Sequence, residues 1–322
     1  MRAIRVQANG GPEVLEAAEI EDPTPAAQQV LVDVAACGVN FIDTYQRSGV
    51  YEVPLPFTPG SEGAGTVREV GAGVTGLAPG DRVAWAMVPA GYAERAVVPV
   101  SKVVRVPEGI DNRTAAAMML QGMTAHYLVS STYPVRTGDT ALVHAAAGGM
   151  GLLLTQLIKA RGGNVIGTVS TAAKERLARE AGADEIIRYT EADVAEQVRS
   201  LTDDRGVDVA YDGVGKDTFE ASLNSLRPRG MFALFGAASG PVPPVDPQRL
   251  NSAGSVFLTR PTLAHHILTR EELDWRAGEI FDAVTRKDLA IRVGGTYPLA
   301  EAARAHEDLE SRRTTGKLLL EP

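Results

Sequence analysis

The chain has 322 residues, 44% of them hydrophobic and 22% charged, a size and composition typical of about two folded domains. No run of 18 or more apolar residues predicts a membrane-spanning helix, and the net charge of −8 argues against nonspecific nucleic-acid binding. The single cysteine, Cys37, excludes an intramolecular disulfide framework, and the N-terminal sequence has no apolar leader, so we expect a cytoplasmic protein.

Short alternating segments, broken by glycine and proline, fill the first 110 residues and indicate a compact β-rich domain. The predicted strands are 30–39, 65–71, 81–87, 92–98 and 102–106. A helix is then predicted to begin at Asp111 or Asn112, since either side chain can cap its N-terminus.

Strands alternate with helices from residue 139 onwards, which predicts right-handed crossovers and a doubly wound parallel sheet in an α/β fold. The predicted strands are 140–145, 164–170, 184–189, 207–212, 230–236 and 255–259. The predicted helices between them are 149–161, 172–181, 191–202 and 217–226. In the tail we predict helices at 270–287 and 299–311 and strands at 289–293 and 318–322, and we expect this tail to rejoin the first domain.

A glycine-rich turn, LVHAAAGGMG at 142–151, joins the first of these strands to its helix. It reads A-x-G-x-x-G across Ala146, Gly148 and Gly151, with alanine in place of the usual first glycine. In this context the backbone N–H groups and the helix N-terminus can face a pyrophosphate, so we predict a dinucleotide site. The alternative is a packed turn that binds no ligand.

The end of the second strand distinguishes NADP from NAD. NAD enzymes place an acidic residue there for the ribose 2′-hydroxyl, and none is present in this chain. Ser170 and Thr171 stand at the strand tip, and Lys174 lies one turn into the next helix. Because each charged hydrogen bond contributes ~1.5–3 kcal/mol, these groups favour a 2′-phosphate, and we predict NADPH. The alternative for Lys174 is a solvated lysine paired with a nearby glutamate.

The segment from Gly138 to Lys159, including Gln156, resembles the signature of the quinone oxidoreductase/zeta-crystallin family, a zinc-free part of the medium-chain dehydrogenase/reductase superfamily. Other segments resemble the bacterial quinone reductase branch, among them NFIDTYQRSGVY (40–51), PGSEGAGTV (59–67) and AHEDLESRRTTGKLLL (305–320). The resemblance covers essentially the whole chain. It implies a discontinuous GroES-like catalytic domain (1–122 and 262–322), a Rossmann NADP-binding domain (123–261), an interdomain cleft for the quinone, and a homodimer.

The same resemblance implies the residues of the site. The implied cofactor-binding residues are Phe41, Thr124, Tyr127, Gly148, Gly149, Met150, Gly151, Ser170, Thr171, Lys174, Tyr189, Val214, Gly236, Ala237, Pro261, Leu263 and Arg312. Among them, Lys174, Tyr189 and Arg312 should surround the 2′-phosphate. The implied catalytic residues are Asn40, Tyr45 and Tyr51, which would position the reactants without a clear acid or base. Asn40 could orient a carbonyl oxygen, and the tyrosines could stack on a planar acceptor or simply form the wall of the site.

No metal is predicted. Zinc-dependent relatives supply a cysteine from G-x-C and a histidine from G-H-E, whereas this chain has G-V-N at 38–40 and G-S-E at 60–62. Cys37 lies three residues before the ligand position and is expected to be a small buried strand residue. We expect His144 to be buried and hydrogen-bonded rather than a base, and the pair His265–His266 to be loop or helix-cap residues.

Without a Lewis acid, an electron-poor acceptor such as a quinone is expected, with water as the proton source and the protein mainly positioning the reactants. Two alternatives stay open. One is an enone or 2-alkenal reductase of the same fold, and the other is a non-catalytic NADPH- or RNA-binding protein, as among the lens crystallins. The acidic net charge argues against the RNA role, and no membrane partner is expected.

Overall fold

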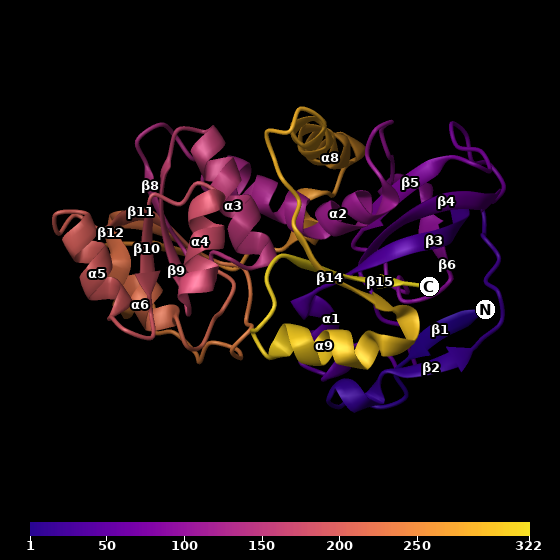
Figure 1. The fold of residues 1–322 in the computed structure, drawn as a ribbon, viewed down its shortest axis with the longest axis horizontal. Coiled ribbons are helices and arrows are strands. Elements are labelled where there is room, and N and C mark those ends of the chain that lie inside the picture. Colours follow the sequence, from indigo (N-terminus) through magenta and orange to yellow (C-terminus); the bar gives the residue numbers. More distant parts are fainter. The chain divides into compact units, whose positions relative to one another are not determined.

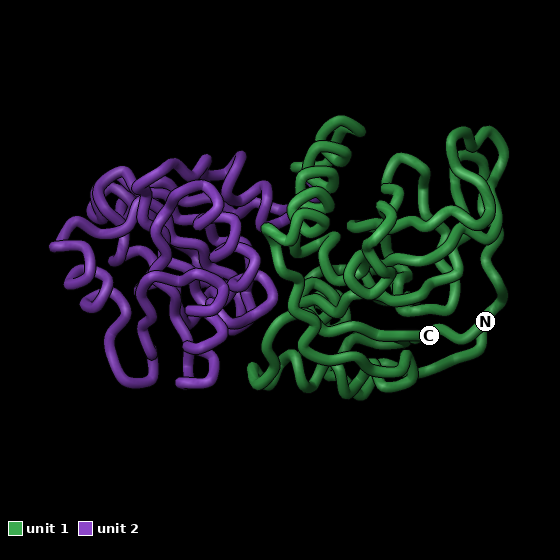
Figure 2. Tube along the Cα trace, turned by 45° about the horizontal axis from the view of Figure 1, so that its top comes forward, with its two compact units in different colours: residues 1–123, 266–322 green, residues 124–265 purple.

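A computed structural model describes residues 1–322 and divides them into two compact units, residues 1–123 with 266–322 and residues 124–265 (Figure 2). These boundaries lie one and four residues beyond the predicted domain boundaries, which follow residues 122 and 261. None of the helices combines the length and the hydropathy that crossing a membrane requires.

The first unit is built on a seven-stranded sheet, drawn in Figure 1. Its strands are β3 (Gln29–Val39), β4 (Glu62–Val70), β5 (Arg82–Ala86), β6 (Arg95–Pro99), β7 (Val103–Arg105), β14 (Val293–Pro298) and β15 (Lys317–Glu321). The strand order is β14-β15-β3-β4-β5-β7, and β6 also pairs with β3. Strand β15 pairs with β3 in the antiparallel direction, with Leu318 opposite Val39. The last strand of the chain therefore completes a sheet that the first third of the chain begins.

The helices of the first unit and its N-terminal hairpin surround this sheet. They are α1 (Phe41–Arg47), α2 (Asn112–Tyr127, which runs on past the boundary), α8 (Arg270–Thr285) and α9 (Ala302–Glu310), with the hairpin strands β1 (Arg2–Arg5) and β2 (Glu16–Glu19). Trp85, Val32 and Leu318 are among the buried residues of the core.

The predicted strand at 289–293 is wrong: β14 begins only at Val293, because its parallel partner β15 begins opposite it.

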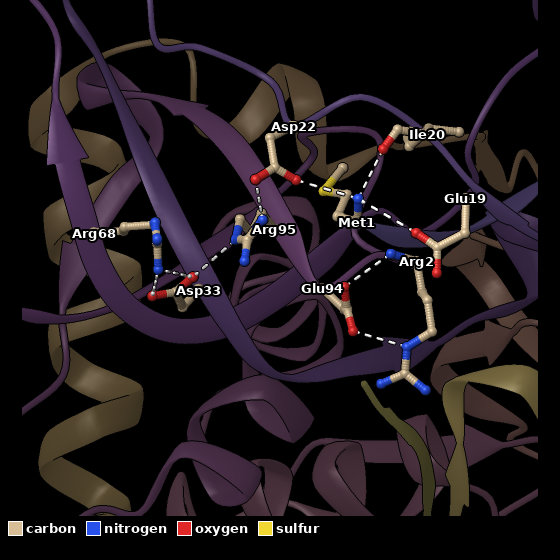
Figure 3. Close-up of polar contacts among 9 residues, drawn as sticks. All are labelled: Met1, Arg2, Glu19, Ile20, Asp22, Asp33, Arg68, Glu94 and Arg95. Atoms are coloured by element: carbon tan, nitrogen blue, oxygen red, sulfur yellow. Dashed lines mark hydrogen bonds and ion pairs between the residues drawn. The ribbon is translucent and has the colours of Figure 1, made fainter.

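Ion pairs connect the N-terminal hairpin to the sheet (Figure 3). Arg2 Nε donates to Glu94 Oε1 at 2.8 Å. Arg95 on β6 donates to Asp22 and, at 3.3 Å, to Asp33 on β3. Ion pairs at the surface are weak, so they orient the hairpin more than they stabilise the unit.

The second unit is a six-stranded sheet of parallel strands. Its elements are β8 (Thr140–Val143), α3 (Gly149–Ala160), β9 (Asn164–Val169), α4 (Ala172–Glu180), β10 (Glu185–Arg188), α5 (Val194–Leu201), β11 (Val207–Asp212), α6 (Phe219–Ser225), β12 (Leu226–Leu234), α7 (Gln248–Ser252) and β13 (Phe257–Thr259). The order is β10-β9-β8-β11-β12-β13, and Figure 1 shows α3 and α4 on one face of the sheet and α5 and α6 on the other. The predicted doubly wound sheet, and with it the α/β fold class, is confirmed.

Short helices of other types complete the fold. They are the 3₁₀ helices η1 (Pro12–Val14), η2 (Val100–Lys102), η4 (Leu263–His266) and η5 (Leu299–Glu301) and the π-helical turn η3 (Leu128–Thr132). The predicted helix at 299–311 is thus divided between η5 and α9. His265–His266 lies at the end of η4, as expected of loop or helix-cap residues.

Candidate active site

The order in which successive strands join the second sheet reverses between β8 and β11. From β8 the connections proceed through β9 to β10, and from β11 they proceed the other way through β12 to β13. In such sheets ligands bind beyond the carboxyl ends of the strands at the point of reversal. Here that position is occupied by the turn at 144–151 after β8 and the loop at 213–216 after β11.

The glycine turn is closed tightly onto its own helix. Gly148 is the N-cap of α3 with an extended backbone at φ −77° and ψ 169°. A Cβ atom on Gly151 would lie 2.3 Å from the carbonyl oxygen of Ala145 and 2.6 Å from the Cα of Ala146. The first turn of an α-helix leaves N–H groups without intrahelical acceptors, so this turn has the donors that a pyrophosphate requires.

The ends of β9 and β10 lie side by side. Tyr189, just after β10, donates its N–H to the Val169 carbonyl at 3.2 Å, and the side chain of Tyr189 is exposed. Thr171 caps α4, since its Oγ1 accepts the N–H of Lys174 at 3.3 Å. The second unit therefore brings together Tyr189, Lys174 and the adjoining Ser170, the residues of this unit expected near a 2′-phosphate.

Lys174 is half-buried, and this burial lowers the pKa of its ammonium group below the usual value. The neighbouring carboxylate of Glu175 lies 3.1 Å from Arg179 and 3.4 Å from Arg188. Glu175 is thus already engaged by two guanidinium groups.

The loop after β11 is organised by the buried carboxylate of Asp212. It accepts the N–H groups of Val214 and Gly215 at 2.8 and 3.0 Å. A Cβ on Gly236 would lie 2.3 Å from the carbonyl oxygen of Gly213, so the segment after β12 lies directly against this loop. Val214 and Gly236, with Ala237 beside it, therefore share one edge of the sheet.

His144 links three strand ends through buried hydrogen bonds, as expected. Its Nδ1 lies 3.1 Å from Thr168 Oγ1, and its Nε2 lies 2.9 Å from Ser222 Oγ, which donates to Asp212 at 2.6 Å. Since the Ser222 hydrogen is directed to Asp212, His144 must donate from Nε2 and accept at Nδ1. Burial lowers the pKa of His144, which favours this neutral form. His144 thus supports the site rather than facing a substrate.

The first unit collects Asn40, Tyr45 and Tyr51, the residues expected to position the reactants, on and around α1. Asn40 immediately precedes this helix, and Phe41 and Tyr45 lie on it with ring centroids 6.3 Å apart. The rings of Tyr45 and Tyr51 meet edge to face at 5.3 Å, and the Tyr51 N–H donates to the Tyr45 carbonyl at 3.0 Å. Tyr51 is 40% exposed, so this pair of tyrosines presents an aromatic surface to solvent, whereas Asn40 is buried.

The Asn40 side chain is held entirely by the protein. Its Nδ2 donates to Glu62 Oε1 at 2.7 Å and to the Gly38 carbonyl at 3.3 Å. Its Oδ1 accepts from Lys317 Nζ at 2.5 Å and from Gln121 Nε2 at 3.4 Å. Both amide hydrogens are therefore engaged before any substrate carbonyl could approach.

Asp43 forms a second buried centre behind Asn40. Its carboxylate accepts hydrogen bonds from the Asn40 N–H at 2.9 Å, from Ser61 Oγ at 2.9 Å and from Tyr92 OH at 3.0 Å. Burial nevertheless raises the pKa of Asp43 to about 6, against the hydrogen bonds that lower it. Asn40 and Ser61, the two positions at which zinc-dependent relatives have ligands, are both tied to this carboxylate.

A polar chain continues from Asp43 to the surface. Tyr92 OH lies 3.1 Å from His306 Nε2, and His306 Nδ1 lies 3.0 Å from Arg47 Nη1. Because a guanidinium can only donate, His306 Nδ1 accepts, and the ring is neutral. Burial, assisted by the charge of Arg47, lowers the pKa of His306 to about 3. Arg47 in turn forms a two-pronged ion pair with Glu310 at 2.9 and 3.1 Å.

The other expected site residues are placed as follows. Thr124, Tyr127 and Leu263 are buried, and Pro261 is half-buried. Arg312 is exposed just after α9, with a left-handed backbone at φ 57°. Cys37 is buried on β3, as expected of a small strand residue, and burial raises the pKa of its thiol. No group of three His, Cys, Asp or Glu side chains is arranged to hold a metal ion.

Five residues of this site were not found by sequence reasoning: Asp43, Glu62, Tyr92, His306 and Lys317. The pair Glu62–Lys317 is separated by 255 positions, and periodicity carries no information at that distance. The one available signal is a glutamate directly before a run of small and apolar residues, EGAGTV at the start of β4, since a charge there needs a buried partner.

Comparison with known proteins places these units in one superfamily. Residues 26–108 match the model of the alcohol dehydrogenase GroES-like domain, and residues 149–280 match the model of zinc-binding dehydrogenases. A quinone oxidoreductase of Pseudomonas aeruginosa is 49% identical over 323 residues, covering 100% of this chain and 99% of that protein. A 2-haloacrylate reductase of a Burkholderia species is 42% identical and covers 98% of each chain. The crystal structure of Escherichia coli quinone oxidoreductase complexed with NADPH is 43% identical, covers 100% of both chains and has a TM-score of 0.98.

Proposed function

Because this chain belongs to the quinone oxidoreductase family of the medium-chain dehydrogenase/reductase superfamily, we propose that it is an NADPH-dependent quinone reductase. The observation that supports this proposal most strongly is the sequence identity to two proteins named quinone oxidoreductase. It is 49% for one and 43% for the other over the full length, and the second was solved with NADPH. The GroES-like unit would be the catalytic domain, and the parallel-sheet unit would bind the cofactor.

The second unit fits NADPH. The turn Gly148–Gly149–Met150–Gly151 offers N–H donors, and three of its four residues have no side chain that would keep a pyrophosphate away. Ser170, Thr171, Lys174 and Tyr189 would bind the 2′-phosphate, and the family resemblance implies the same role for Arg312. The remaining contacts of the cofactor would come from Phe41, Thr124, Tyr127, Val214, Gly236, Ala237, Pro261 and Leu263. When bound, NADPH supplies the hydride.

The residues around α1 would position the acceptor. The aromatic pair Tyr45–Tyr51, with ring centroids 5.3 Å apart, presents a surface on which a planar quinone ring can pack. Both amide hydrogens of Asn40 are engaged by Glu62 and Gly38, so Asn40 acts as a fixed support rather than as a donor to the quinone. Water supplies the protons, because aromatic delocalisation stabilises the reduced oxygen and no strong general acid is required.

We also propose a homodimer that works in the cytoplasm. Strand β13 ends the second sheet, so its outer edge has no neighbouring strand within the chain, and Phe257 on it is 58% exposed. Edge strands of this kind pair readily with a second copy. Light scattering of the wild type and of Phe257→Lys tests the proposal: a monomeric wild type would contradict it.

The test of the activity is an NADPH-oxidation screen of the purified protein over quinones, enones and aldehydes. We expect the highest kcat/KM with a quinone, and a clear preference for NADPH over NADH that Lys174→Met reduces by about tenfold, the equivalent of one charged hydrogen bond. Equal efficiency with NADH would refute the cofactor assignment. Turnover of aldehydes but not of quinones would refute the acceptor.

A second candidate is reduction of an activated C=C bond, and the 2-haloacrylate reductase at 42% identity favours it. Hydride transfer to such a bond needs the same positioning, but it leaves a carbanion that requires a proton from a defined side. A 2-haloacrylate and an alkenal in the same screen decide between the two: a higher kcat/KM with either of them than with every quinone would make this the principal activity.

A further inference from the structure

One buried ammonium group lies at the centre of a polar cluster in the first unit. Lys317, the first residue of β15, donates from Nζ to Glu62 Oε1 and to Asn40 Oδ1, both at 2.5 Å. The side chains of Lys317 and Glu62 are only 2% and 0% exposed. A buried charge that loses its partner is strongly destabilising, so neither residue can be changed alone without consequence.

The two charges dictate which way the Asn40 amide points. An ammonium group only donates hydrogen bonds, so the oxygen of Asn40 must face Lys317. A carboxylate only accepts, so the amide nitrogen must face Glu62. In the flipped orientation the amide nitrogen would meet the ammonium and the amide oxygen would meet the carboxylate, and neither pair could form a hydrogen bond.

The backbone leaves room for this cluster at one position. Gly38 lies on β3, two residues before Asn40, and a Cβ atom there would lie 2.1 Å from Glu62 Oε1 and 2.6 Å from Lys317 Cε. Any side chain at Gly38 would therefore push the charged pair out of place. The glycine is needed for the pair and not for an unusual backbone angle, since its φ is outside the left-handed region.

We infer that Lys317 is a positioning residue for hydride transfer, which fixes Asn40 and Glu62 and, through them, the start of α1. The inference rests on the proposed function. Asn40 immediately precedes α1, which carries Tyr45, and the second oxygen of Glu62 accepts the Leu120 N–H of α2 at 2.6 Å. Through these contacts the Lys317 side chain connects β15, β4, α1 and α2.

The simpler interpretation is an ion pair that only stabilises the fold. Two uncharged double variants separate the two interpretations, because both remove the buried charges together. Glu62→Gln/Lys317→Met has no hydrogen-bond donor at position 317, whereas Glu62→Gln/Lys317→Gln keeps one. A purely structural role predicts the same kcat for both double variants, and a positioning role predicts a lower kcat for the methionine variant.

The experiment measures kcat, the KM for NADPH, Tm and hydrogen–deuterium exchange of residues 40–47 for these variants and for Lys317→Met. Lys102→Met is the matched control, because Lys102 bonds only a backbone carbonyl, that of Ile267, at 3.1 Å. We expect Lys317→Met to lower kcat about 100-fold with little change in the KM for NADPH, as a misplaced reactant does. The segment at 40–47 should exchange faster in this variant, and the control should behave as the wild type does.

Both double variants should recover Tm, and the glutamine variant should exceed the methionine variant in kcat by about tenfold, the effect of one hydrogen bond. Equal kcat in the two double variants, or wild-type kcat in Lys317→Met, would overturn the inference. Should the wild type reduce no quinone at all, the proposed function fails by itself. The exchange of residues 40–47 then still tests positioning: unchanged exchange in Lys317→Met contradicts it.

Discussion

The protonation state of Asp43 should make the first unit less stable as the pH rises. Burial raises the pKa of this carboxyl from 3.8 to about 6, although it accepts three hydrogen bonds. Between these two values the folded protein keeps the proton and the unfolded chain has lost it, so the free energy of unfolding falls with pH. A difference of about two pKa units corresponds to about 3 kcal/mol, present in full below pH 4 and lost above pH 6.

The substitution Asp43→Asn removes this titration and leaves a side chain of the same size. At each pH the free energy of unfolding of Asp43→Asn is subtracted from that of the wild type. We expect this difference to fall by about 3 kcal/mol from pH 4 to pH 7. Urea unfolding followed by tryptophan fluorescence measures it, because both tryptophans, Trp85 and Trp275, lie in the same unit as Asp43. Asp282→Asn, at an exposed site on α8, is the control and should show no such trend. A difference that is constant with pH, or that increases, would refute the reasoning.

Three further changes have defined outcomes. His306→Gln should show the opposite trend from Asp43→Asn, because the pKa of His306 is lowered to about 3. As the pH falls from 6.5 to 4, the free energy of unfolding of the wild type should fall by about 3 kcal/mol relative to that of the variant, measured by the same urea titrations. Tyr51→Phe keeps the ring that packs on Tyr45, so kcat with a quinone should fall by less than about tenfold; a loss of about 100-fold or more with intact NADPH binding would identify Tyr51 as a required proton donor. Gly151→Ala places a methyl group against backbone atoms and should cost about 1–3 kcal/mol in thermal unfolding and weaken NADPH binding. Gly278→Ala in α8, where nothing beyond the helix's own nearby backbone lies within 4 Å of the new Cβ, should instead be neutral or stabilising, and equal destabilisation by the two changes would contradict the packing argument.

The elements predicted well are those whose signal is local. The second unit follows its predicted strands and helices closely because each buried strand is a short apolar run and each helix has its own apolar face; β11 matches the prediction at both ends. Family membership also follows from local motifs, and the relatives confirm it. The helix α1 was not predicted, because its seven residues carry little periodicity and the helix is held by the hydrogen bonds of Asp43 and Asn40.

The strand at 289–293 shows the limit of local reasoning. Its residues, LAIRV, are mostly apolar, but pairing starts only at Val293, where β15 begins opposite it. A strand exists where its partner exists, and that partner lies in the following segment, after a helix and the turn at Gly316. The apolar character of the segment could not supply this information.

The amino-acid sequence by itself determined the glycine turn with its A-x-G-x-x-G spacing, the lack of an acid after the second strand, and the replacement of zinc ligands by Asn40 and Ser61. Each of these depends on neighbours within a few residues, whose spacing the chain carries directly. Only the tertiary structure decided what surrounds Asn40: Glu62 and Lys317, 255 positions apart, meet because β15 pairs with β3 beside β4. The protonation of Asp43 and His306 was decided in the same way, because burial and neighbouring charges set a pKa, and both arise only when distant segments pack together.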